Sequence, residues 1–209
     1  MKNQNLNTLV KISVLGAMAL VLMMFEIPLP LFPNFLKIDF SDIPALLGAF
    51  ALGPVAGVVI EFLKNVLNGA ITGSTSMWVG ELANFLVGSA YVFTAGYIYK
   101  KNKSKKTAVQ GMILGIIAMI IIASIFNYYV LIPFYAKLFG MQIKDIVAMA
   151  AAANPKITDL TAYIVWAVVP FNALKGIVIA VVTAPLYKKV SPLFHRDAVA
   201  NPKEELNQM

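Results

Sequence analysis

Apolar residues fill most of the chain in long runs, separated by short polar or charged stretches. Runs of about twenty apolar residues can cross the roughly 30 Å of hydrocarbon in a bilayer. The pattern therefore predicts an all-α membrane protein with six transmembrane helices. The predicted helices cover residues 8–26, 41–52, 54–69, 80–99, 107–133 and 159–187.

Two segments between these helices have a different pattern. Residues 27–39 carry Pro28, Pro30 and Pro33, and prolines at this spacing favour stiff extended backbone over helix. The long connection before the last helix contains an Ala/Met-rich, amphipathic piece near 141–153. We expect the proline-rich segment to form a loop outside the membrane.

The apolar region 41–69 is ambiguous by pattern alone. It could be one long kinked helix or two short helices that turn at Gly53-Pro54. Because lysines are retained on the cytoplasmic side, the cluster "KKNKSKK" (100–106) should lie on the same side as the basic residues near both termini. Only two helices meet this condition. They place both termini inside, and 27–39, 70–78 and 135–158 outside.

Composition supports the membrane class. The chain has 209 residues, of which 59% are hydrophobic and 13% are charged, about half the charged fraction of a soluble domain. The absence of cysteine excludes disulfides and thiolate metal sites. The net charge of +7 follows from the inward-facing lysines, so it does not indicate nucleic-acid binding. We expect one six-helix domain over 1–190 and a cytoplasmic polar tail over 191–209.

Polar residues at membrane depth are candidates for function. Several lie three or four residues apart on the predicted helices, so that they share a helix face. In the six-helix topology most of them fall in the outer half of the membrane, and together they predict a polar pocket open to the outside and covered by the 27–39 loop. The candidates are Asp39, Lys64, Asn68, Glu81, Asn84, Asn127, Asn172 and Lys175.

Structural explanations compete with ligand binding at each position. Glu61 and Lys64 could pair with each other as i,i+3 neighbours, and a single Asn in a membrane helix often joins two helices, with a stabilisation of about 0.6 kcal/mol. Lys175 lies near the middle of "FNALKGIVIAVV" (171–182), where a lysine costs roughly 3 kcal/mol. Glu61 is its only evident acidic partner at comparable depth, which favours a ligand role for Lys175.

Enzyme signatures are missing from the sequence. It has no G-x-x-x-x-G-K-[ST] motif for ATP, and its single histidine, His195, lies on the tail and cannot serve a Ser/His/acid set at membrane depth. No specific motif supports a membrane enzyme that would use Glu81 and Asp39. The sequence therefore predicts a protein without catalytic activity.

Three motifs carry a family resemblance: "PLPLFPNFLKIDFSDIPALLGAFALGP" (28–54), "GELANFLVG" (80–88) and "FNALKG" (171–176). Over about 8–189 the chain resembles the riboflavin-specific S components of energy-coupling factor (ECF) transporters. That resemblance implies a multi-pass protein of the bacterial cell membrane. It would take up riboflavin as its ligand, without a cofactor, together with a transmembrane coupling subunit and two cytoplasmic ATPases.

The resemblance also implies roles for particular residues. Asn127, Asn172 and Lys175 would contact the flavin, whose tricycle has one edge of alternating carbonyl and N–H groups that a carboxamide can both donate to and accept from. The family places an Ala-x-x-x-Ala pattern on its first helix, where small residues let partner helices approach. This chain departs from that pattern. Its nearest match is Ser13-x-x-x-Ala17, with Gly16 and Ala19 nearby, and these four residues are the candidates for the partner interface.

Two rival functions remain open at this stage. One is a small membrane enzyme that acts on a lipid or isoprenoid substrate, and the other is a channel or stand-alone facilitator. Riboflavin that co-purifies with the protein would separate the S-component hypothesis from both.

Overall fold

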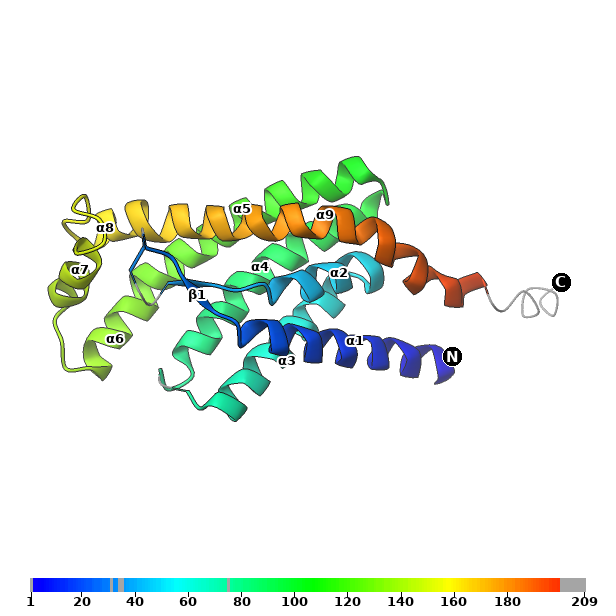
Figure 1. Cartoon of the computed structure of the whole chain (residues 1–209), viewed down its shortest axis with the longest axis horizontal. Helices are drawn as coiled ribbons and strands as arrows, with labels where there is room; N and C mark the ends of the chain where they lie inside the picture. The colour runs from blue at the N-terminus through cyan, green and yellow to red at the C-terminus, as the bar shows by residue number, and fades with distance from the viewer. Residues whose placement is uncertain (1, 31, 34–35, 75, 200–209) are drawn as a thin grey trace.

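The structure is a computed structural model that describes residues 2–30, 32–33, 36–74 and 76–199, with side chains described from 6 to 187 within these ranges. It is a bundle of helices with one small two-stranded sheet (Figure 1). The helices are α1 (Lys2–Met23), α2 (Asp42–Leu52), α3 (Pro54–Thr72), α4 (Val79–Lys101), α5 (Lys105–Phe126), α6 (Ile132–Leu138), α7 (Ile143–Ala151), α8 (Leu160–Tyr163) and α9 (Val169–Val199), with π-helical turns η1 (Asn127–Leu131) and η2 (Ile164–Val168).

The predicted six-helix arrangement is confirmed, including the turn at Gly53-Pro54. Gly53 has φ 109°, a conformation that favours glycine, and Pro54 begins α3. Five of the helical stretches are long and apolar enough to cross a membrane, and α2 has only 11 residues. Because α2 is almost entirely buried, other helices of the chain surround this short helix.

The last helix extends further than its apolar pattern predicts. α9 continues to Val199 rather than ending near 187, so the predicted polar tail begins within a helix. Residues 200–209 of that tail lie outside the described residues. The first helix differs at both ends, since α1 spans Lys2–Met23 and not 8–26.

Each π-helical turn stands two residues before a proline. η1 ends at Leu131 before Pro133, and η2 ends at Val168 before Pro170. A proline inside a helix removes one backbone donor and crowds the preceding turn, and a π turn is one way to keep the helix continuous around that defect. Predicted helices 107–133 and 159–187 therefore each contain one wide turn.

Close packing of small residues brings α4 and α5 together. A Cβ on Gly111 of α5 would lie 2.7 Å from the backbone oxygen of Ala95 on α4. Only glycine allows the two backbones to approach this closely, and such contacts drive helix association in membranes. The lysine-rich stretch 100–106, which we call the α4–α5 turn, comprises the end of α4, the connecting residues 102–104 and the start of α5.

The proline-rich loop returns on itself as a short hairpin. Strand β1 (Ile27–Pro28) pairs antiparallel with β2 (Lys37–Ile38), and Ile27 is opposite Ile38. The Lys37 Nζ donates to the Glu26 carboxylate over 2.7 Å beside this sheet. The predicted extended backbone over 27–39 is found at Ile27–Pro28 and Lys37–Ile38. Between these strands the chain turns, with hydrogen bonds from Phe32 N to Leu29 O and from Leu36 N to Pro33 O.

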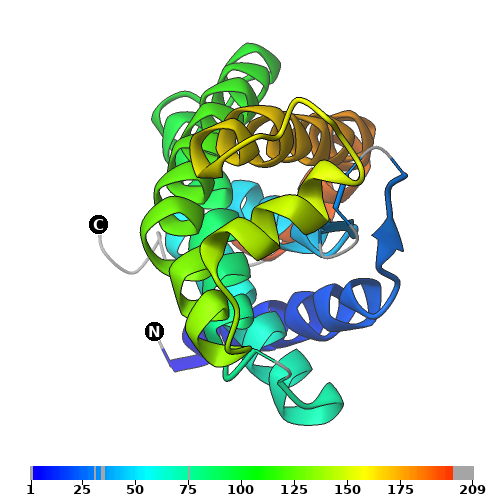
Figure 2. The ribbon, with the colours of Figure 1, turned by 90° about the vertical axis from the view of Figure 1, so that its left-hand side faces the viewer.

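The start of α1, the end of α9 and the α4–α5 turn lie at one end of the molecule, and α7 and α8 lie at the other (Figure 1). Figure 2 looks onto that second end, which α7 crosses in front of the other helices. The lysine distribution predicts that the first of these ends faces the cytoplasm and that the second faces outward.

The orientation of those ends gives a direct test. Asn102→Cys, in the exposed α4–α5 turn, should stay unlabelled by an impermeant thiol reagent in intact cells and become labelled after permeabilisation. The native chain has no cysteine, so no background arises. Lys144→Cys, exposed on α7, is the matched control and should be labelled in intact cells. The reverse pattern would invert the topology.

Candidate functional site

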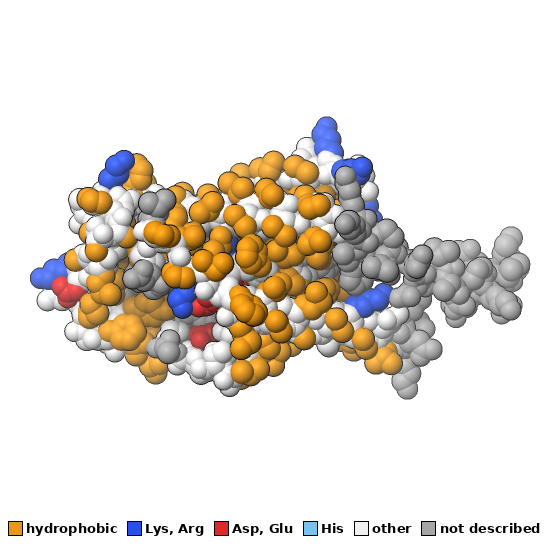
Figure 3. Space-filling view, in the orientation of Figure 1, with side chains coloured by type: hydrophobic (Ala, Val, Ile, Leu, Met, Phe, Trp, Pro, Cys, Tyr) orange, Lys and Arg blue, Asp and Glu red, His pale blue; other side chains and the backbone are white. Residues whose placement is uncertain are grey.

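Two adjoining cavities collect most of the predicted site residues. The outer cavity, of about 340 Å³, and the inner one, of about 190 Å³, share Lys37, Gly80, Asn84 and Tyr135 in their walls. Together they fall within the usual size range of ligand sites. Figure 3 shows acidic side chains and a basic one set back among the largely apolar side surface. Seven predicted residues line the cavities: Asp39, Asn68, Glu81, Asn84, Asn127, Asn172 and Lys175.

The inner cavity has two buried carboxamides on neighbouring helical segments. Asn127 Nδ2 donates to Ala123 O over 2.9 Å, and Asn172 Nδ2 donates to Val168 O over 2.8 Å. Each amide is thus held against the turn that precedes it. The Asn127 Oδ1 is buried and has no hydrogen-bond partner. A buried acceptor left unpaired costs about 1–3 kcal/mol, so this position is suited to a ligand that donates a hydrogen bond.

The proline-rich loop covers this cavity, as predicted. Leu36 and Lys37 form part of its wall. Phe32, near the tip of the loop, meets the ring of Phe171 edge-on with 5.5 Å between centroids. Phe171 itself lines the cavity, so the loop is packed onto the site through an aromatic contact.

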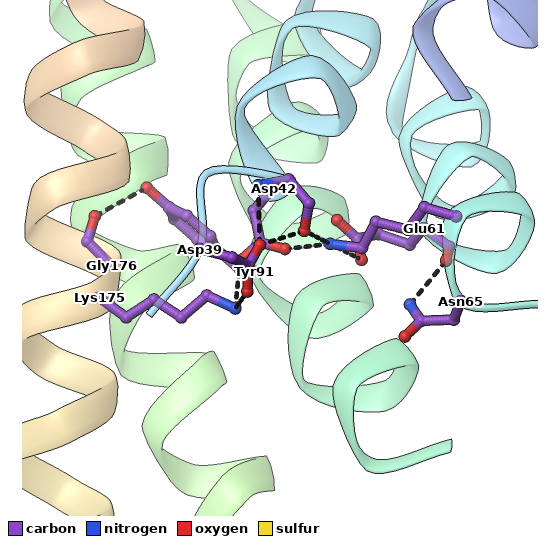
Figure 4. A network of polar contacts seen from close by, with 9 residues as sticks. Asp39, Asp42, Glu61, Asn65, Tyr91, Lys175 and Gly176 are labelled. Atoms are coloured by element: carbon purple, nitrogen blue, oxygen red, sulfur yellow. Dashed lines mark hydrogen bonds and ion pairs between the residues drawn. The ribbon is translucent and has the colours of Figure 1, made fainter. Parts of the chain in front are cut away.

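The acidic partners of Lys175 are different from the one predicted. Lys175 Nζ lies 3.1 Å from Asp39 Oδ2 and 3.2 Å from Asp42 Oδ2 (Figure 4). Glu61, the partner expected from depth, instead forms its ion pair with Lys64 at 2.8 Å. The sequence argument failed because it counted only acidic residues inside long apolar helices, whereas Asp39 and Asp42 enter the membrane region on the loop and the short α2.

Lys64 has a structural role within the bundle. Its side chain is fully buried, lines neither cavity, and bonds to Asp42, Glu61 and Ser41, with 2.7 Å between its Nζ and Ser41 Oγ. The structural explanation, an i,i+3 pair with Glu61, therefore holds. Lys64 is the one predicted substrate-binding residue that lines neither cavity, so the structure does not bring it together with the other seven.

Asp42 is the residue that sequence reasoning missed. It is completely buried and links Lys64 to Lys175. A Ser-Asp pair at the start of an apolar helix is typical of an ordinary helix N-terminus, which conceals this role. Two signals could have identified it. They are the shortness of α2, which requires shielding by the protein, and the need of two buried lysines for more than one carboxylate.

Counted together, three carboxylates face two ammonium groups in this cluster. All five residues are at most 6% exposed. We call this set the ion cluster, and its members are Asp39, Asp42, Glu61, Lys64 and Lys175. With every group ionised it would carry one net negative charge, which a low-dielectric interior disfavours. Glu61 has the fewest polar partners of the five, since the one ion pair that its carboxylate forms among the described residues is with Lys64.

Gly88 separates Glu61 from the inner cavity. A Cβ at this position would overlap the Glu61 carboxylate, and Gly88 also forms part of the cavity wall. The final glycine of "GELANFLVG" therefore makes room for a buried charged group next to the ligand space.

The outer cavity is held by hydroxyl groups. Glu81, on the first turn of α4, accepts hydrogen bonds of 2.9 Å from Ser74 and from Ser76. Asn68 of α3 and Asn84 of α4 lie in the same wall. All three were predicted as site residues, and the α3–α4 connection brings them together.

The small residues of α1 divide between two faces. Ser13 and Ala17 are exposed, whereas Gly16 contacts Leu63 and Ala19 is fully buried. A partner surface on α1 can therefore include Ser13 and Ala17. Gly16 and Ala19 pack inside the chain, so the structure does not bring them together with Ser13 and Ala17 on one exposed face.

Comparisons with known proteins agree with this geometry. Residues 7–187 match the family model of the ECF transporter, substrate-specific component. The chain belongs to this family. It is 39% identical over 188 residues to the riboflavin transporter RibU of Staphylococcus aureus, covering 90% of this chain and 92% of that one. It is 36% identical over 196 residues to the riboflavin transporter FmnP of Bacillus subtilis, covering 92% and 96%.

A solved structure described as "Structure and mechanism of the S component of a bacterial ECF transporter" superposes with a TM-score of 0.70. It is 36% identical and covers 94% of this chain and 100% of that one. The protein is therefore a multi-pass membrane component of a bacterial ECF transporter and not an enzyme. The rival hypothesis of a lipid- or isoprenoid-modifying enzyme is set aside.

The charge count of the ion cluster predicts unequal effects of two substitutions. Lys64→Met leaves Asp42 and Glu61 without their shared cation, and breaking a buried pair in this way typically costs about 3–5 kcal/mol. Glu61→Gln keeps the side-chain volume and removes the surplus negative charge, so it should cost much less. Denaturant unfolding in mixed micelles measures both. Equal losses of unfolding free energy would contradict the charge count.

Proposed function

We propose that this S component captures riboflavin in the two adjoining cavities and delivers it to an ATP-driven importer. The supporting observation is the pair of fixed carboxamides beside a loop-covered cavity, one of them with an unpaired acceptor. Riboflavin offers the matching chemistry, because its flat tricycle presents an N–H between two carbonyls along one edge. The names of the relatives point to the same vitamin.

Each polar group of the inner cavity can then be given a partner on the ligand. The unpaired Asn127 Oδ1 accepts the flavin N–H, which removes the cost of its burial. An ammonium group has three donors. Two of those on Lys175 are directed to Asp39 and Asp42, and the third is left for a flavin carbonyl or a ribityl oxygen. The outer cavity, with Asn68, Glu81 and Asn84 in its wall, suits the hydroxyl groups of the ribityl chain.

The remaining parts of the importer come from other chains. The sequence lacks a nucleotide-binding motif, so the energy source is separate from this chain. We infer a transmembrane coupling subunit and two cytoplasmic ATPases as partners. The exposed face of α1, which includes Ser13 and Ala17 among large apolar side chains such as Val10, Val14 and Met18, is the proposed contact with the coupling subunit.

The binding role of Asn127 is testable by titration. Asn127→Leu keeps the side-chain size and removes the amide, so riboflavin affinity should fall roughly tenfold to a hundredfold. The measurement is quenching of flavin fluorescence by the purified full-length protein. Asn102→Leu, on the exposed α4–α5 turn, is the matched control and should bind as the native protein does. Native affinity in Asn127→Leu would exclude the amide contact.

The partner role of α1 needs a separation of binding from transport. Ala17→Trp places a bulky group on the exposed face of α1, so riboflavin uptake by cells carrying the whole importer should drop severalfold while riboflavin affinity stays unchanged. Ile121→Trp, at an exposed position of α5, controls for bulk on a lipid-facing surface. Equal loss of binding and uptake in Ala17→Trp would mean that α1 supports the core instead.

A further inference from the structure

An apolar groove lies at the end of the molecule opposite the vitamin cavities, between α5 and α9. It has a volume of about 320 Å³ and a wall that is almost entirely apolar. Phe50 of α2 forms its buried floor, and Val109 at its edge is about half exposed. The lining residues are Phe50, Lys105, Ala108, Val109, Met112, Ala184, Pro185 and Tyr187.

The one charged residue in the wall of this groove is Lys105, which begins α5. Lys105 is exposed and has no ion-pair partner among the residues that the structure describes. It belongs to the turn 100–106, which holds five lysines and no carboxylate. The groove thus joins an apolar slot at membrane depth to a basic cluster at the membrane surface.

We propose that this groove binds an anionic phospholipid of the cytoplasmic leaflet, with one acyl chain in the slot and the phosphate at Lys105. The two parts of the site match the two parts of such a lipid. Basic pockets between membrane helices on the cytoplasmic side bind anionic headgroups, and each nearby lysine strengthens the attraction. A soluble anion would use the lysine but leave the apolar slot empty, and a zwitterionic lipid would fill the slot without a net charge to neutralise.

The site is separate from the other proposed surfaces. Helix α1, the proposed partner surface, packs on α3 and α2 and makes no principal contact with α5 or α9. Figure 1 shows α1 and α5 on opposite sides of the bundle. The lipid can therefore stay bound while the partner is docked and while the vitamin cavities fill or empty.

Native mass spectrometry of the purified full-length protein tests the headgroup. Equal amounts of phosphatidylglycerol and phosphatidylcholine with the same acyl chains compete for the protein. The native chain should retain phosphatidylglycerol several times more often. Lys105→Gln should reduce that adduct about fivefold, and Lys103→Gln, on the same turn but outside the groove, should change it less than twofold. Equal retention of both lipids, or equal loss in both variants, would overturn the proposal.

A second pair of variants tests the acyl chain. Ala184→Phe fills the slot and should reduce phosphatidylglycerol retention, whereas Val181→Phe, exposed on the same helix, should not. Size-exclusion profiles and melting temperatures close to those of the native protein confirm folding. Full retention in Ala184→Phe, or displacement of the lipid by millimolar inorganic phosphate, would mean that only surface charge is involved and would contradict the proposal.

Discussion

Two lysines and three carboxylates buried against one another set the positions of the elements around the site. They come from three parts of the chain that lie far apart in sequence: the end of the proline-rich loop with α2, the middle of α3, and α9. Removed from water, each of these charges is tolerated only when it is paired. The pairing therefore fixes where the loop re-enters the bundle and where α2 starts. It also fixes the position of α9 along its axis relative to α2 and α3. Ser41 reinforces this junction, since its backbone N–H donates to Asp39 over 2.8 Å.

The ligand site uses the same junction. Lys175 belongs both to the ion cluster and to the wall of the inner cavity. Its positive charge is therefore paired with carboxylates before any ligand binds. The two carboxamides line the same cavity and lie within or near helical turns that prolines have widened. Irregular backbone of this kind is tolerated in a membrane only where the surrounding protein shields it. Here it occurs beside the cavity, where the chain needs polar groups directed inward.

Much of the fold follows from the hydrophobic pattern, because a bilayer imposes helix length and lysine placement on any sequence. The split at Gly53-Pro54 and the extended loop were predictable for that reason. The site was predictable as a set of polar residues at membrane depth, and most of that set does line the cavities. Its pairing was not predictable, because ion pairs between distant segments depend on how helices dock. Asp42 shows the limit, since its position in sequence fits an ordinary helix start, and only the packing of the short α2 reveals that it is buried.

The state of the polar groups before binding bears on affinity. Ordering a rotamer-rich side chain on binding costs about 0.5–1.5 kcal/mol, and this cost falls when the side chain is already held. Asn127 and Asn172 are each held by the carbonyl four residues earlier, and two carboxylates hold Lys175. The site is thus held on its helical side before any ligand binds. Among the described residues, the loop is held by the two-residue strand pair, by the Lys37–Glu26 ion pair and by the contact of Phe32 with Phe171, and Asp39 joins its end to the ion cluster. Polar groups that are already held lose little side-chain freedom when the ligand binds, and this favours tight binding.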